Sequence, residues 1–324
     1  MSISEIQDKK KWNDFVLSSG QKDVFLQSFQ WGEFQKSYGR KVLRIGFEKN
    51  NRVEYGWQII FMPSVLSHSY AYVPRPVSFH TDLLKAVSVL SRQKKIIFPR
   101  LDLASDVVDK KDAFSRYMGE VQPQEELIID ISGDENRLLS EMKQKTRYNI
   151  QVAKKHSVVI EKYSGLALDE ERINLFLGLV QKTSKRHDFR SHDSSYYRMM
   201  MKKLSEDKTL TLFLAKKYGK YIAGNIVVLF GKMATYLHGG SDEDYKKYMA
   251  PYLLQWEAIQ FGKLSGARYY NFGGASEVKK RWSGITRFKR SFSQNTELTQ
   301  HAGVWDYKNK RLLYLAYTLA KKIK

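Results

Sequence analysis

The order of predicted elements in the second half of the chain constrains the fold most, because strands and helices alternate there. Apolar residues at every second position indicate strands, whereas apolar residues three or four positions apart indicate helices. The strands predicted in this way cover residues 158–163, 209–217, 221–230, 234–239 and 267–272. The predicted helices cover residues 141–156, 168–185, 196–204 and 252–264. This mixture predicts the α+β class, with a mixed sheet flanked by helices.

The first half repeats a comparable order of elements, and 324 residues suit two ordinary domains. A helix is predicted from about Gln30 to Tyr38, and a second one over residues 81–92. Strands are predicted at residues 41–48, 54–62, 69–73, 95–103 and 127–130, with a polar turn KNNR between the first two. We therefore expect one domain over residues 1–140 and a second over residues 141–302.

The C-terminal segment, about residues 303–324, is predicted to contain an amphipathic helix. Leu312, Leu315, Leu319 and Ile323 share one side of that helix. We expect this helix to pack on a domain, with the first domain as the candidate.

The charge of the chain favours anionic partners. Lysine and arginine total 55 against 34 aspartates and glutamates, which gives a net charge of +21. Such a surplus favours RNA, anionic lipid or nucleotide-linked substrates. The absence of cysteine excludes a disulfide framework, a thiol nucleophile and a thiolate metal site.

No stretch of the sequence looks like a targeting or membrane-spanning segment. The first fifteen residues are polar, and the apolar stretch at residues 222–230 is about half of what a membrane helix needs. We expect a cytoplasmic protein and a monomer, whose contact with the inner face of the plasma membrane is peripheral.

Two basic segments are candidates for phosphate contact. Residues 142–162 hold six cations together with Tyr148 and Asn149, and the alternative is a solvated helix face. Residues 269–292 place Gly273 and Gly274 after a strand, followed by a basic loop. The cations of that loop are Lys279, Lys280, Arg281, Arg287, Lys289 and Arg290, and Trp282, Phe288 and Phe292 lie among them.

Aromatic rings between cations can stack on an unpaired base beside a phosphate. We therefore expect RNA contacts from Lys279, Lys280, Arg281 and Arg287. The alternatives are an ordinary turn at the glycine pair, a surface loop and a place for Phe292 in a core strand.

The common cofactor and metal motifs are absent from the sequence. The seven histidines show no HExxH spacing, and neither a G-x-G-x-x-G loop nor a P-loop occurs. Residues 239–252 lack the basic x-x-G-x-G/A loop with which N-acetyltransferases hold the pyrophosphate of acetyl-CoA. We therefore expect neither a cofactor nor a metal.

Seven stretches in a consistent order resemble the FemABX family of peptidoglycan interpeptide-bridge transferases. They are FLQSFQWGEFQKSYGRK, YVPRP, FPRLDL, KQKTRYNIQVAKK, RHDFRSHDSSYY, YMAPYLLQWEAI to YYNFGG, and GITRFKRSF. The resemblance implies two tandem acetyltransferase (GNAT)-like domains. No long heptad stretch occurs in the second half, so the chain is similar to the compact members without a coiled-coil arm.

The resemblance also implies a reaction in peptidoglycan synthesis and cell-wall biogenesis. An amine of the stem peptide of a nucleotide- or lipid-linked precursor attacks the ester carbonyl of an aminoacyl-tRNA. The donor ester is already activated, so the enzyme has to orient two anionic substrates and stabilise an oxyanion.

By the same resemblance, individual residues acquire roles. Lys289 supplies the electrostatic stabilisation and Phe288 contacts the acceptor end of the tRNA. Lys36 and Arg190 hold the diphosphate of the precursor, and Asp102 orients or deprotonates the attacking amine. Tyr196, Tyr197 and Tyr236 line the peptide groove.

Each of these residues also has a structural interpretation. Lys289 can be a surface lysine of a basic loop, and Asp102 can cap a helix. Three further functions stay open: a CoA-dependent N-acyltransferase, a non-catalytic RNA-binding module, and an aminoacyltransferase whose acceptor is a protein N-terminus.

Overall fold

The computed structural model describes the chain except for residues 1–2, 65–67, 94–95, 105–113, 188–190 and 323–324. The chain divides into two compact units. Unit 1 comprises Met1–Gln124 and Gln300–Lys324, and unit 2 comprises Glu125–Thr299. This boundary lies before the expected one near residue 140, because strand β7 (Glu125–Asp130) pairs with a strand of unit 2.

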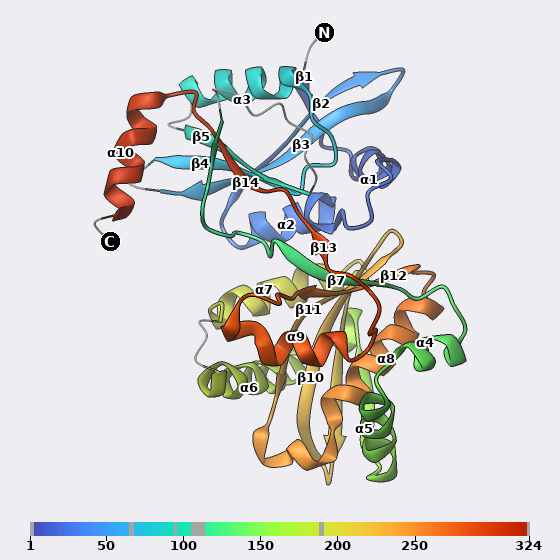
Figure 1. The fold of residues 1–324 in the computed structure, drawn as a ribbon. Coiled ribbons are helices and arrows are strands. Elements are labelled where there is room, and N and C mark those ends of the chain that lie inside the picture. Colours follow the sequence, from blue (N-terminus) through green and yellow to red (C-terminus); the bar gives the residue numbers. More distant parts are fainter. Residues whose placement is uncertain (1–2, 65–67, 94–95, 105–113, 188–190, 323–324) are drawn as a thin grey trace. The chain divides into compact units, whose positions relative to one another are not determined.

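Unit 1 contains a seven-stranded sheet in the order β1-β2-β3-β4-β5-β14-β6 (Figure 1). Its strands are β1 (Ile3–Glu5), β2 (Lys41–Lys49), β3 (Arg52–Pro63), β4 (Ser69–Pro74), β5 (Ile96–Leu103), β6 (Phe114–Arg116) and β14 (Gly303–Tyr307). Its helices are α1 (Lys9–Ser18), α2 (Phe29–Ser37), α3 (Thr81–Gln93) and α10 (Arg311–Lys322). Only the β4–β5 pair is parallel among the described pairings of this sheet. Helix α3 packs through Leu83 and Val87 on the face that carries Trp57 and Ile59.

Unit 2 also contains a seven-stranded sheet, in the order β13-β7-β12-β11-β10-β9-β8. Its strands are β7, β8 (Val159–Tyr163), β9 (Leu210–Lys217), β10 (Lys220–Phe230), β11 (Met233–Ser241), β12 (Tyr269–Gly274) and β13 (Thr299–Gln300). Its helices are α4 (Glu135–Glu141), α5 (Gln144–Lys155), α6 (Glu170–His187), α7 (Ser194–Ser205), α8 (Ala250–Leu264) and α9 (Ser283–Arg290). Helices α5 and α8 share one apolar core with Phe213, Val227 and Phe272. The expected mixed sheets flanked by helices are confirmed.

Local sequence explains the tight hairpins of both sheets. Asn50 and Asn51 join β2 to β3 with φ values of 51° and 61°, and Tyr218 and Gly219 join β9 to β10 with φ values of 50° and 73°. Two successive left-handed residues match the right-handed twist of the flanking strands, and asparagine and glycine adopt this conformation at little cost. The turn predicted at KNNR is confirmed.

Two further sequence-based expectations differ from the structure. The segment expected as a basic loop after Gly274 contains a short 3₁₀ helix (Lys280–Trp282) and helix α9. Helix α10 does pack on β5, but through Tyr314 and Tyr317 against Phe98. Leu312, Leu315 and Leu319 of its expected inner side are exposed instead, and Ile323 lies outside the described residues.

Within the described part of the chain, we find no helix with both the length and the apolar character that crossing a bilayer requires.

Candidate active site

The candidate site of unit 2 lies where two adjacent parallel strands of its sheet, β11 and β12, diverge. Strands β11 and β12 pair only from Met233 to Thr235 and from Tyr269 to Asn271. Beyond these pairs β11 continues along β10, whereas Gly274 of β12 pairs with β7. Gly273 has a φ of +71°, and a Cβ added there would lie 3.4 Å from the Tyr236 carbonyl oxygen. The backbone thus diverges in a conformation that suits glycine, and it leaves room for a side chain from another element.

The side chain of Lys289, from α9, lies between the diverging strands β11 and β12. Its side chain is buried, with only 6% of its surface exposed, so it is no surface lysine. The Nζ atom donates a hydrogen bond to the Gly274 carbonyl oxygen at 2.6 Å and lies 5.8 Å from the ring centre of Tyr236. Burial lowers the pKa of Lys289 to about 8, and the nearby carboxylate of Glu126 opposes that effect.

Helix α9 is tied to the segment that follows β12. The Thr286 hydroxyl accepts a hydrogen bond from the Ser276 backbone N–H at 2.9 Å and donates one to the Ser276 carbonyl oxygen at 3.1 Å. Thr286 precedes Lys289 by about one helical turn, so both side chains leave the same side of α9. These bonds fix the position of the ammonium group relative to the ends of the strands.

Phe288 lies beside Lys289 but belongs in part to the core. Its ring packs edge-on against Tyr252 at 5.1 Å and against Phe292 at 5.4 Å. Phe292 is buried in the turn that follows α9, and not in a core strand. Phe288 is half-buried, so its ring keeps an accessible part beside the cations.

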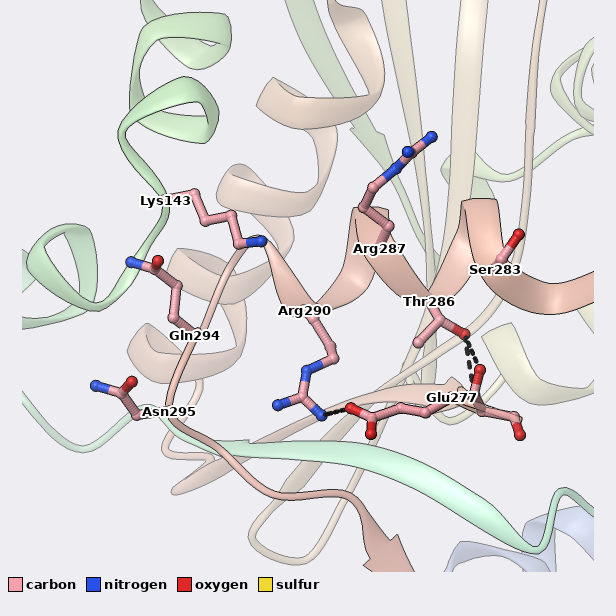
Figure 2. A pocket seen from close by; sticks show the side chains of 9 residues that line it. Lys143, Glu277, Ser283, Thr286, Arg287, Arg290, Gln294 and Asn295 are labelled. Atoms are coloured by element: carbon pink, nitrogen blue, oxygen red, sulfur yellow. Dashed lines mark hydrogen bonds and ion pairs between the residues drawn. The ribbon is translucent and has the colours of Figure 1, made fainter. Parts of the chain in front are cut away.

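A cationic groove runs beside α9, and we define it by Lys143, Lys145 and Arg287. Two adjoining pockets of about 600 Å³ and about 470 Å³ share Lys143 and Arg287 in their linings, and Lys145 lines the second. The Lys143 backbone N–H donates to the Ser291 carbonyl oxygen at 2.9 Å, which holds the start of α5 next to the end of α9. Figure 2 shows Lys143 directed toward α9, whereas Arg290 turns to Glu277.

The three groove cations are exposed, and none pairs with a carboxylate in the described chain. Glu277, the carboxylate in the lining of the first pocket, is paired with Arg290, so the three groove cations keep a local positive potential that an anion would relieve. The N-terminus of α5 adds to it, since its cap residue Lys143 makes no side-chain capping bond.

The other cations expected to contact RNA are distributed along the same segment. Lys279 lies over the Trp282 ring at 4.6 Å, and Lys280 and Arg281 belong to the exposed 3₁₀ turn before α9. The structure therefore gathers these residues, Arg287 and Phe288 around one short helix.

The expected groove tyrosines lie on two elements of unit 2. Tyr196 and Tyr197 of α7 are buried, and the Tyr197 ring contacts His238 of β11 at 4.9 Å. Tyr236 is half-buried on β11, and burial raises its pKa to about 12. Burial and the neighbouring His192 lower the pKa of His238 to about 3, so its imidazole is neutral at physiological pH.

The sequence analysis missed His192, His238 and Asn225 as parts of this site. The Asn225 side-chain Nδ2 is buried without a hydrogen-bond partner, and Asn225 pairs with Gly239 of β11. No spacing in the sequence links these residues, because they come from separate elements that only the sheet brings together.

Asp102 lies on β5 of unit 1, in a unit different from that of Lys289. Its carboxylate is 1% exposed and lies 3.3 Å from an Arg75 guanidinium nitrogen. It also accepts hydrogen bonds from the Tyr72 hydroxyl at 3.2 Å and the Gln122 backbone N–H at 3.1 Å. Burial raises the pKa of Asp102, and Arg75 counteracts this effect. Its role toward an attacking amine stays a prediction.

The two residues expected to hold a diphosphate have different outcomes. Lys36 lies in the last turn of α2 in unit 1, is exposed, and its Nζ lies 2.9 Å from a Glu33 carboxylate oxygen. Arg190 lies outside the described residues. Among the described residues, no group of three or more His, Asp or Glu side chains is placed to hold a metal ion.

Known proteins of one family resemble this chain over most of its length. The chain is 22% identical to the lipid II:glycine glycyltransferase of Staphylococcus saprophyticus, over 90% of both chains. It is 22% identical to the enzyme of the same name from Staphylococcus epidermidis, over 96% of this chain and 93% of that one.

Solved structures agree on the fold. A crystal structure of FemX superposes with a TM-score of 0.82 at 20% identity, covering 97% of this chain and 99% of that one. A tandem GNAT protein from the clavulanic acid pathway gives a TM-score of 0.57 at 10% identity, covering 95% and 98% of the two chains. The expected fold of two tandem GNAT-like domains is confirmed. The sequence model of the FemAB family matches residues 110–217 and 214–322, and the chain therefore belongs to the FemAB family.

Proposed function

We propose that this enzyme transfers an amino acid from aminoacyl-tRNA to an amine of a peptidoglycan precursor. The observation that carries the proposal is the buried Lys289 ammonium on α9, the same helix whose Arg287 lines the cationic groove. The transferase activity rests on the family, whose members from Staphylococcus are named lipid II:glycine glycyltransferases.

The reaction forms one bond and breaks one bond. The amine nitrogen attacks the ester carbonyl carbon, and the tetrahedral intermediate then expels the ribose hydroxyl oxygen of the tRNA. The proton that the amine loses ends on that leaving oxygen, so no external reductant, oxidant or nucleotide is consumed. Lys289 would stabilise the oxyanion, because a cation is worth more in a site from which water is excluded.

The groove suits a polynucleotide donor. Lys143, Lys145 and Arg287 would neutralise backbone phosphates, and the accessible part of Phe288 would stack on a terminal base. An acyl-CoA donor is less favoured, because acidic residues precede α8 where a pyrophosphate loop would be needed. They are Asp242, Glu243 and Asp244.

The acceptor is proposed to be a nucleotide- or lipid-linked precursor. Lys36 and Arg190 are proposed to bind its diphosphate, and Asp102 to orient its amine. Peripheral contact with the inner face of the plasma membrane would give access to a lipid-linked form.

A donor-competition assay tests the proposal. The full chain is incubated with a stem-peptide precursor and labelled aminoacyl-tRNA, and in parallel with labelled acetyl-CoA. We expect an amide product only from the tRNA. Product from the thioester alone would establish an N-acyltransferase, and RNA binding without any product would establish a binding module. Muropeptide mass spectrometry of a deletion strain separates a peptidoglycan acceptor from a protein N-terminus.

The groove gives a prediction of its own. The double variant Lys143→Gln/Arg287→Gln is expected to raise the KM for the donor about tenfold with kcat nearly unchanged, since the removed contacts are made in ground and transition states alike. The slope of log KM against log salt is expected to fall by about one for each cation removed. The matched control is Lys154→Gln/Lys155→Gln at the other, exposed end of α5. Equal losses in both double variants would show general charge attraction instead of a site.

A further inference from the structure

Helix α10 exposes the apolar side that its sequence pattern predicted to be buried. The exposed fractions of Leu312, Leu315 and Leu319 are 83%, 56% and 60%. These residues are spaced by three and four positions and form one stripe along the helix. Figure 1 shows α10 beside β4 and β5 in unit 1, with its other side turned away from that sheet.

The opposite side of α10 is fixed to unit 1 by aromatic contacts. Tyr317 is 3% exposed, and its ring lies 4.9 Å from that of Phe98 on β5. The Tyr314 ring lies 5.1 Å from Phe98, and its hydroxyl donates to an Asp306 carboxylate oxygen at 3.1 Å. The leucine stripe is therefore presented by a helix that is already held in place, so docking would not have to fold it.

The charged residues of the chain segment that carries the stripe all have one sign. Residues 307–324 contain six lysines and arginines and no acidic residue. The nearest carboxylate before them, Asp306, is buried and bound to Arg100. Arg311 begins α10, and the first turn holds no acidic residue. A cation near the N-terminus of a helix is repelled by the positive end of the helix dipole, so these cations do not stabilise the helix.

We propose that α10 docks on the surface of an anionic lipid bilayer. Its leucines would enter the boundary between headgroups and acyl chains, while the flanking cations would contact lipid phosphates. A helix with an apolar stripe, basic flanks and no acidic residue has the features of an interfacial helix. This inference goes beyond the transfer reaction, because it concerns unit 1 and requires no substrate.

A second copy of this chain fits the stripe less well. Two such chains would each bring a net charge of +21 and the same basic flanks to the interface. A twelve-residue helix is only roughly 18 Å long, and stable interfaces bury on the order of 1,000 Å² or more. An anionic bilayer complements both the leucines and the cations.

Vesicle sedimentation with the full chain tests the proposal. One set of vesicles contains phosphatidylcholine alone, and the other contains phosphatidylcholine with phosphatidylglycerol. We expect binding to the anionic vesicles, weakened by salt, and a drop of about tenfold in the partition coefficient for Leu315→Gln/Leu319→Gln. The matched control is Leu264→Gln, an 88% exposed leucine at the end of α8 in unit 2, which should bind like the unchanged protein.

Two results would overturn the proposal. One is equal vesicle binding by Leu315→Gln/Leu319→Gln and the unchanged protein, which would leave the leucines without a role. The other is an absence of binding to the anionic vesicles; a dimer that the same substitutions dissociate in sedimentation velocity would then make the stripe a contact between copies. Circular dichroism of each variant checks that α10 and the fold are retained. Because no donor or acceptor is present, the outcome is independent of the proposed reaction.

Discussion

Lys289→Met is expected to lower kcat about 10²–10³-fold, with the KM of both substrates changed only a few-fold. This is the effect of removing one preorganised donor from an oxyanion site. The lysine side chain lies among Tyr236, Gly273 and Gly274. A methionine side chain retains most of its length but carries no charge. Because a buried cation is replaced by an apolar group of similar volume, the fold is expected to persist. Single-turnover rates with aminoacyl-tRNA measure the effect.

The pH dependence distinguishes an electrostatic role of Lys289 from a structural one. With a pKa of about 8, Lys289 is mostly in its ammonium form below that pH and half in it at that pH, and the ammonium fraction falls about tenfold per pH unit well above it. The single-turnover rate of the unchanged enzyme should therefore decline above about pH 8, and this decline should vanish in Lys289→Met. The control is Lys220→Met, on an exposed lysine at the start of β10. An unchanged rate in Lys289→Met, or a decline that persists in it, would contradict the proposed role.

The lowered pKa of Lys289 makes the free energy of unfolding depend on pH. Lys289 releases its proton near pH 8 in the folded protein but near its ordinary value of 10.5 when unfolded. Between these values the unfolded chain binds more protons, so the free energy of unfolding rises with pH. Relative to Lys289→Met, the unchanged protein should gain up to about 3 kcal/mol over this range. Urea unfolding at pH 7 and pH 10 measures the gain without any substrate.

Asp306→Ala is expected to lower the free energy of unfolding of unit 1 by about 3–5 kcal/mol. Arg100 donates from Nε and Nη2 to the two carboxylate oxygens of Asp306 at 2.7 and 2.8 Å, and both side chains are 1% exposed. The residues face each other across β5 and β14. The variant would leave the Arg100 guanidinium buried and without its carboxylate, which is the costly way to break such a pair.

Two comparisons interpret the Asp306 result. Asp14→Ala breaks the exposed Lys10–Asp14 pair of α1 and should leave the free energy of unfolding almost unchanged. Arg100→Met/Asp306→Leu removes both buried charges and should recover most of the loss, because it leaves no unpaired ion. Chemical denaturation followed by circular dichroism measures all three proteins. A loss in Asp306→Ala as small as that in Asp14→Ala would refute the assigned importance of the pair.

The site illustrates how far local patterns reach. The sequence predicted the strand before Gly273 and Gly274, and family resemblance selected Lys289. The sequence pattern also predicted a loop where helix α9 forms. The reason is that the many cations at residues 279–290 obscure the helical spacing of Thr286 and Lys289. The bonds from these two residues to Ser276 and Gly274 join the helix to a strand end, and no local pattern encodes such bonds.

Local patterns also failed to predict the partners of two strands, β14 and β7, because these partners lie far away in the sequence. Strand β14 follows β5 by about two hundred residues yet pairs with it, and Arg100 meets Asp306 only through that pairing. Strand β7 was expected in the first domain because it follows that domain in sequence. Its partner β12 comes much later in the chain and places it in unit 2.

The sequence by itself determined the features that depend only on residues close together in the chain. These are the alternation of strands and helices, the polar turn at residues 49–52, the cationic character and the stretches that resemble the family. The tertiary structure decided which side of α10 is buried, that Lys289 lies inside the protein, and that Lys143 and Arg287 share a groove. Periodicity establishes that a helix has an apolar side, but burial depends on which distant element covers it. For α10, Phe98 and Asp306 bind the tyrosine side, and the leucine side is left to the solvent.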